Sequence, residues 1–263
     1  MADSVNKEQL PVMMYVHGFM SGANGAKQRQ LQKEFKGQYR VIAPELDGDP
    51  DKSLNIINEI IRTEKPSVIV GTSLGGWMAT MCDSKDVKII IVNPCTKPEE
   101  ELSRWLNEPQ TYFCKRLDGI QTYLLTDTIL NKYKKYDFNS KVLENKERIY
   151  ALCSEYDELL GTRHIELLKS LVSRNHLLIK DDFGHQCKDM GLHHLYNLIR
   201  YAISGVNQSY IDFYINFYKD TYELTPAETA NIIETGATIS DVLILRKIMK
   251  AANDGNHTKF YPE

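Results

Sequence analysis

The clearest indication of the fold is one stretch of sequence, Ser67-Val68-Ile69-Val70-Gly71-Thr72-Ser73-Leu74-Gly75-Gly76-Trp77-Met78-Ala79-Thr80-Met81-Cys82. Three β-branched residues lead into Gly71 and predict a buried strand, and the apolar residues after Ser73 recur at helical spacing. The junction fits G-x-S-x-G, a tight strand-to-helix turn that presents a serine at the end of a sheet. Glycines two residues to either side of the serine avoid Cβ atoms that would press against this turn. The plainer alternative is a glycine-punctuated turn, as found in any α/β protein.

The overall composition is that of a soluble globular protein. At 263 residues, with 42% apolar and 25% charged residues, the chain can form one large domain, or one domain with an appendage. The net charge is −3 and no Lys/Arg stripe stands out, so nothing favours a nucleic-acid partner. Five scattered cysteines without a C-x-x-C pair favour reduced thiols over disulfides or a metal site. The polar N-terminus and the lack of a long apolar run predict a cytoplasmic protein without a membrane partner.

Strand and helix patterns alternate about six times along the chain. Strands are expected at residues 12–16, 39–43, 68–70, 87–92, 148–153 and 176–180. This alternation predicts a mostly parallel sheet with helices on both faces, a three-layer α/β sandwich. Ligands of such sheets bind outside the carboxyl ends of the strands, and the polar residues of interest all follow strands.

Two segments depart from this alternation. Residues 96–146 show no strand pattern and mix aromatic with charged residues, so we expect a mostly helical insertion that forms a lid. Residues 205–263 are expected to form a helical C-terminal appendage to a main domain of residues 1–204. In the appendage, an aromatic stripe over 210–218 indicates one helix, and Thr225-Pro226-Ala227-Glu228 fits a capping box at the start of another.

A serine nucleophile needs a histidine base and a carboxylate, and in this kind of sheet the chain order is serine, acid, histidine. His185 is the preferred base because it lies in the loop after the sixth expected strand. The acid is expected at Asp157, after the fifth strand, with Glu155 as the alternative. The remaining histidines are expected to be structural (His17, His176, His193 and His194) or on the surface (His164 and His257).

An oxyanion formed by attack of the serine on a carbonyl needs backbone N–H donors. Leu74, directly after the serine, can supply one. The second is expected from Phe19 in the loop after the first strand, with Met20 as the alternative, and Gly18 permits a close backbone approach. His17 is interpreted as an anchor of this loop.

With these residues placed, the chain resembles the α/β-hydrolase superfamily, and most of all the small YqiA/YcfP-like bacterial esterases. The matching pieces are Tyr15-Val16-His17-Gly18-Phe19, Gly71-Thr72-Ser73-Leu74-Gly75-Gly76-Trp77, Asn93-Pro94, the Asp157 loop and Gly184-His185. They span about residues 11–204. The resemblance implies a compact hydrolase fold that lacks the first two strands of larger members. It also implies a hydrolase that uses Ser73, Asp157 and His185 without a metal or organic cofactor.

The expected function is a serine hydrolase that cleaves a small carboxylic ester or thioester through an acyl-enzyme. The same three residues would serve a peptidase or amidase. A different class of function is a catalytically silent hydrolase fold that binds a partner or metabolite. The aromatic residues of the insertion indicate either an apolar substrate portion or packing of the lid onto the sheet. The pattern does not specify the substrate-binding residues or the oligomeric state.

Overall fold

The computed structural model describes residues 10–204 together with Thr225, Ala227, Glu228 and Arg246. The chain divides into two units, residues 1–203 and 204–263, and the first of them carries the sheet.

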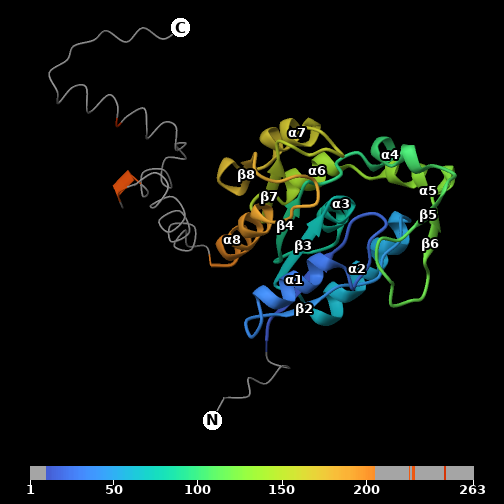
Figure 1. Ribbon diagram of the computed structural model, residues 1–263, viewed down its shortest axis with the longest axis horizontal. Helices are drawn as coiled ribbons and strands as arrows, with labels where there is room; N and C mark the ends of the chain where they lie inside the picture. Colours follow the sequence, from blue (N-terminus) through green and yellow to red (C-terminus); the bar gives the residue numbers. More distant parts are fainter. Residues whose placement is uncertain (1–9, 205–224, 226, 229–245, 247–263) are drawn as a thin grey trace, which may run out of the picture. The chain divides into compact units, whose positions relative to one another are not determined.

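Six parallel strands form one sheet in the order β2-β1-β3-β4-β7-β8 (Figure 1). The strands are β1 (Val12–Val16), β2 (Arg40–Ile42), β3 (Val68–Thr72), β4 (Lys88–Val92), β7 (Ile149–Ser154) and β8 (Leu177–Lys180). All six predicted strands are confirmed, with small shifts at their ends. Thr72 pairs with Val92 and Ser154 pairs with Lys180, so the carboxyl ends of the strands are aligned along one edge.

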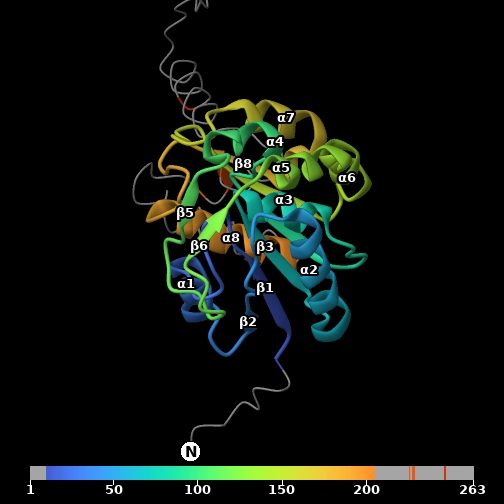
Figure 2. The same ribbon diagram turned by 90° about the vertical axis from the view of Figure 1, so that its right-hand side faces the viewer.

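Helices cover both faces of the sheet (Figures 1 and 2). The main ones are α1 (Ala26–Glu34), α2 (Pro50–Glu64), α3 (Leu74–Met81), α7 (Arg163–Leu171) and α8 (Met190–Ser204). Because side chains alternate along a strand, Met13 and Tyr15 join a core with α1 and α8, whereas Met14 and Val16 join one with α2, α3 and α7. The predicted three-layer sandwich is therefore confirmed.

Helix α2 begins at Pro50, directly after its N-cap residue. The N-cap is Asp49, whose carboxylate accepts from the Asp51 N–H at 3.1 Å. Pro50 then occupies the first helical position, where its missing N–H costs nothing. The Ser53 hydroxyl, in the first turn of α2, donates to the Asp47 carbonyl at 3.0 Å.

The sequence predicts a mostly helical insertion between β4 and β7, but the insertion also contains two strands. Its elements are α4 (Pro98–Glu101), β5 (Pro109–Thr111), β6 (Thr122–Leu124), α5 (Asp127–Lys132) and α6 (Phe138–Glu144), with 3₁₀ turns at Ser103–Trp105 and Tyr133–Lys135. Strands β5 and β6 form an antiparallel hairpin outside the main sheet. The hairpin gives no alternating apolar signal because each strand has only three residues, most of them exposed.

The insertion is fastened to the start of α2. Lys132 donates to the Asp49 carboxylate at 2.6 Å, and the Tyr133 hydroxyl donates to the Gly48 carbonyl at 2.7 Å. The Tyr136 hydroxyl donates to Asp51 at 2.7 Å. These bonds connect the insertion to the loop that follows β2.

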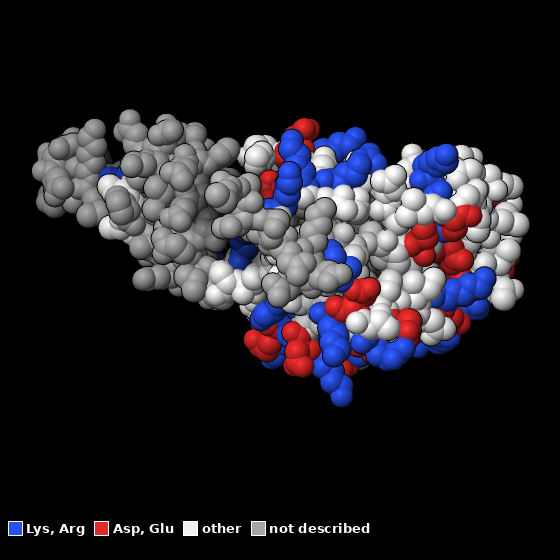
Figure 3. Space-filling view, turned by 90° about the horizontal axis from the view of Figure 1, so that it is seen from below, with Lys and Arg blue, Asp and Glu red and all other residues white. Residues whose placement is uncertain are grey.

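In the second unit, the capping box is confirmed. The Thr225 N–H donates to the Glu228 carboxylate at 2.7 Å, and the Glu228 N–H donates back to the Thr225 hydroxyl at 3.3 Å. The aromatic stripe over 210–218 lies outside the described residues. Among the residues described, no helix has the length and apolar character needed to span a bilayer. On the face shown in Figure 3, basic side chains lie among acidic ones without a stripe of one sign.

Candidate active site

Ser73 lies at the junction of β3 and α3 with φ 55° and ψ −123°, a conformation that side-chain-bearing residues rarely adopt. The two glycines of the motif make this turn sterically allowed. A Cβ on Gly71 would lie 2.3 Å from the Gly75 carbonyl oxygen, and a Cβ on Gly75 would lie 2.1 Å from the Val16 carbonyl oxygen. The strained serine at the carboxyl end of a central strand is the geometry of a nucleophile elbow.

The loop after β1 runs beside the Ser73 hydroxyl. A Cβ on Gly18 would lie 3.7 Å from the Ser73 Oγ and 3.2 Å from its Cβ, so the loop backbone passes close to the serine. The N–H groups of Phe19 and Met20 donate to no acceptor within residues 10–204. The Leu74 N–H is at the first position of α3, where a helix offers no acceptor of its own. Within residues 10–204, N–H groups without an acceptor therefore occur both directly after the serine and in the loop that passes close to it.

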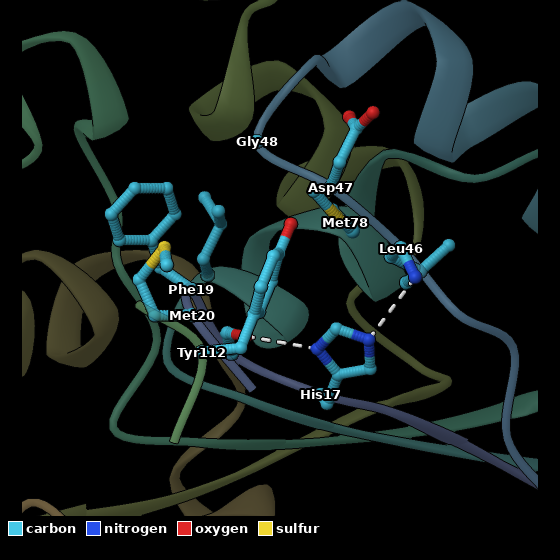
Figure 4. A pocket seen from close by; sticks show the side chains of 10 residues that line it. His17, Phe19, Met20, Leu46, Asp47, Gly48, Met78 and Tyr112 are labelled. Atoms are coloured by element: carbon cyan, nitrogen blue, oxygen red, sulfur yellow. Dashed lines mark hydrogen bonds between the residues drawn. The ribbon is translucent and has the colours of Figure 1, made fainter. Parts of the chain in front are cut away.

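His17 holds this loop in place and is not placed to act as a base. Its Nδ1 lies 2.9 Å from the Gly18 carbonyl oxygen, and its Nε2 accepts from the Leu46 N–H at 3.2 Å (Figure 4). The Leu46 N–H fixes the tautomer, because Nε2 must be unprotonated to accept it and Nδ1 then carries the proton. Burial lowers the pKa of His17 to about 4, so the ring is neutral near pH 7.

Asp157 and His185 form a buried pair. The His185 Nδ1 lies 2.8 Å from Oδ2 and 3.0 Å from Oδ1 of Asp157. Burial alone would raise the pKa of the Asp157 carboxyl, but the bond and charge of His185, with the N–H groups of Leu159 and Leu160, outweigh it and lower the pKa below its usual value. The carboxylate is thus ionised near pH 7 and accepts from Nδ1, which leaves Nε2 as the free ring nitrogen. The alternative acid, Glu155, is exposed.

Ser73 and His185 are attached to the same short segment at the end of β4. The Ser73 N–H donates to the Val92 carbonyl at 2.9 Å. The next residue, Asn93, donates from its side-chain amide to the His185 carbonyl at 3.2 Å. The three residues expected from the sequence therefore converge on one edge of the sheet. The role of Asn93 is not evident in the sequence beyond its place at the end of a strand.

The expectation that His164 lies on the surface is wrong. Its side chain is on the inner face of α7 and only 1% exposed, and neither ring nitrogen has a hydrogen-bond partner in the described part of the chain. Burial lowers the pKa of His164, so the ring is neutral near pH 7. His164 shares the buried face of α7 with Ile165 and Leu168, an apolar periodicity that indicates this burial.

A small pocket of about 220 Å³, including its open mouth, lies beside the loop after β1 (Figure 4). Its lining residues are His17, Gly18, Phe19, Met20, Leu46, Asp47, Gly48, Leu74, Met78 and Tyr112. Tyr112 comes from the insertion, and Phe19 packs against Trp105 of the insertion with ring centroids 5.4 Å apart. The residues that carry these N–H groups, Phe19, Met20 and Leu74, thus border a pocket of mixed polar and apolar lining that the insertion helps to form.

The model of the family described as "Uncharacterised protein family (UPF0227)" matches residues 12–202, most of the chain and all of the sheet. The chain belongs to the UPF0227 family. A UPF0227 protein of Pectobacterium atrosepticum is 26% identical over 161 residues, which cover 58% of this chain and 78% of that protein. Residues 12–202, which the family model matches, include every candidate site residue named above.

Solved structures with a similar architecture include an α/β-hydrolase domain-containing protein and a lipase. The mouse α/β-hydrolase domain-containing protein 10 has a TM-score of 0.53 at 15% identity, covering 74% of this chain and 90% of that one. The monoacylglycerol lipase of Paleococcus ferrophilus has a TM-score of 0.54 at 12% identity, covering 75% and 96%. At these identities the likeness shows the fold, and this UPF0227 chain therefore has the α/β-hydrolase fold.

Proposed function

We propose that this protein is a serine hydrolase that cleaves a carboxylic ester or thioester, with Ser73 as nucleophile, His185 as base and Asp157 as the orienting acid. The observation that carries the proposal is the buried Asp157–His185 pair, held to the same segment at the end of β4 as the elbow serine. Solved structures of the same fold, such as the monoacylglycerol lipase, support ester chemistry.

In the proposed reaction, Nε2 of His185 takes the proton of the Ser73 hydroxyl as its oxygen attacks the carbonyl carbon of the substrate. Asp157 accepts from Nδ1, which keeps Nε2 unprotonated before the attack and stabilises the imidazolium after it. The intermediate then expels the alcohol or thiol, which takes its proton from His185. Water, deprotonated by the same histidine, releases the acid from the acyl-enzyme.

The N–H group of Leu74 and that of Phe19, with Met20 as the alternative, stabilise the negative oxygen of the intermediate in this proposal. The loss of one such donor typically raises the barrier by about 3 kcal/mol. The adjacent pocket, lined by both apolar and polar side chains, would hold the acyl or alcohol group. The pocket is small even with its open mouth included, which favours a short group.

Hydrolysis of 4-nitrophenyl esters and acyl thioesters of graded chain length tests the proposal. The wild-type protein should hydrolyse short esters with saturation kinetics, and Ser73→Ala should lower kcat by roughly 10⁴-fold or more. Ser170→Ala, at an exposed serine of α7, is the matched control and should keep full activity. Equal rates for Ser73→Ala and wild type, or no turnover of any ester or thioester by folded wild-type protein, would contradict the proposal.

A further inference from the structure

The carbonyl groups of the loop that carries His185 are held by side chains from three other parts of the chain. Five successive carbonyl groups, from Phe183 to Cys187, each accept a hydrogen bond from a side chain. Ser154, at the end of β7, donates to the first carbonyl. Asn93 donates to the next two and Lys27 to the last two.

The loop requires such support because its backbone is strained. Cys187 and Asp189 both have a φ of 48°, which is unfavourable for residues with a Cβ. Among the described residues, a single backbone bond closes the turn, from the Cys187 N–H to the Gly184 carbonyl at 3.0 Å. The remaining carbonyls of a partly buried loop need donors, and here side chains provide them.

Asn93 holds the loop from the side of the sheet. Its side chain is fully buried, and its amide donates to the Gly184 and His185 carbonyls at 3.3 and 3.2 Å. The amide oxygen accepts from the Ser154 N–H at 2.8 Å. This one side chain therefore connects the His185 loop to β7, which leads to the acid, and to β4, which contacts the serine.

Lys27 holds the loop from the opposite side, from the first turn of α1. Its ammonium group donates to the Gln186 carbonyl at 3.0 Å and to the Cys187 carbonyl. Burial lowers the pKa of Lys27, and among the described residues no carboxylate forms an ion pair with it. The two carbonyls lie one and two residues beyond the candidate base His185. Partial burial of a charge without a counter-ion is costly, which indicates that the position of this loop matters.

We propose that Lys27 and Asn93 are positioning residues that clamp the His185 loop from its two sides and keep the imidazole aligned between Asp157 and Ser73. This inference rests on the proposed function, and neither side chain needs to touch the substrate. A displacement of a catalytic group by about 1 Å can lower turnover roughly 100-fold, so loss of either clamp should reduce kcat more than it changes KM.

The test compares Lys27→Met, which keeps the length of the side chain without its donors, with Lys27→Arg, which keeps donors. Lys33→Met, at an exposed lysine of the same helix, is the matched control. Lys27→Met should lower kcat on a short ester about tenfold or more with KM within about twofold of wild type. Lys27→Arg should recover most of this loss, and Lys33→Met should match wild type.

A second readout does not depend on activity. The Nδ1 proton of His185 shared with Asp157 should give a downfield proton NMR signal that disappears in His185→Asn. In Lys27→Met this signal should shift or exchange faster with water, and in Lys33→Met it should be unchanged. If no ester is hydrolysed by the wild type but the signal responds in this way, the proposed function fails and the clamp stands.

Asn93→Asp probes the other side, and it serves as the test if Lys27→Met does not fold. It keeps the acceptor for the Ser154 N–H but places a carboxylate oxygen against the Gly184 and His185 carbonyls. Both side chains act through the same loop. The fold loss in kcat of the Lys27→Met/Asn93→Asp double variant should therefore be smaller than the product of the two single losses. Wild-type kcat and an unchanged His185 signal in Lys27→Met or Asn93→Asp would overturn the proposal.

Discussion

Among the acidic residues of the loop after β7, Asp157 stands apart in its burial and in its partners. It receives the imidazole N–H of His185 and two backbone N–H groups, from Leu159 and Leu160. Glu155, two residues earlier, is exposed. A buried carboxylate with three donors orients a base in a way that a solvated one cannot.

We therefore expect Asp157→Asn to lower kcat by roughly 10⁴-fold, because an amide cannot stabilise the imidazolium and can favour the wrong tautomer. Glu155→Gln should leave kcat within about twofold of wild type. Steady-state hydrolysis of a short ester measures both, and circular dichroism verifies that each variant is folded. A large loss in Glu155→Gln with normal turnover in Asp157→Asn would assign the acid to Glu155.

The lowered pKa of His17 leads us to expect that the stability of the fold depends on pH. Its pKa falls from about 6.5 in the unfolded chain to about 4 in the folded protein, because burial disfavours the charged ring. Between about pH 6.5 and pH 4, His17 is protonated in the unfolded state but not in the folded state. The free energy of unfolding therefore declines as the pH falls through this range. The contribution of this one group is at most about 3 kcal/mol.

Urea unfolding from pH 7 to pH 4 tests this expectation with His17→Asn, whose amide can still donate to the Gly18 carbonyl but does not titrate. The free-energy difference between wild type and variant should shrink as the pH falls through this range. A difference that stays constant with pH would show that His17 titrates alike in both states.

At the scale of elements, the junction of β3 and α3 depends on the absence of side chains. Gly75 contacts the end of β1, where its missing Cβ leaves room for the Val16 carbonyl oxygen. This contact fixes α3 against β1, and so fixes the distance between Ser73 and the loop that follows β1. Stability and the geometry around the serine are thus coupled at this position.

Gly75→Ala should lower the free energy of unfolding by about 3 kcal/mol or more, because backbone must move to relieve a 2.1 Å contact. Gly119→Ala is the control: its φ is 78° but no atom lies within 4 Å of the added methyl group, so the cost should be about 1–2 kcal/mol. Equal losses for the two variants in urea unfolding would contradict the steric explanation.

The strands of the insertion cannot be predicted from the sequence pattern, whereas those of the main sheet can. Strands β1, β3, β4 and β7 are almost wholly buried, so their continuous apolar runs are visible in the sequence. The β5–β6 hairpin is built from short, exposed strands and is held by backbone bonds, such as that from the Tyr112 N–H to the Gln121 carbonyl at 3.0 Å. Such pairing depends on tertiary context and leaves no apolar period.

At the scale of the whole molecule, the parallel sheet explains both what the sequence predicts of the site and what it does not. Parallel strands end at one edge, so a serine, an acid and a histidine that each follow a strand are expected to meet there. The partners of Asn93 and Lys27 are loop carbonyls far away in sequence, and no spacing rule points to them. The burial of His164, in contrast, is indicated by its place on the apolar face of α7 with Ile165 and Leu168.

The central claim is that Ser73 is a nucleophile activated by His185. Reaction of the full chain with a fluorophosphonate, read out by intact mass and peptide mapping, tests it most directly. One adduct is expected, located on Ser73, with no adduct in Ser73→Ala and labelling slowed by roughly 100-fold or more in His185→Ala. Folded wild-type protein that stays unlabelled, or that is labelled at a residue other than Ser73, would contradict it.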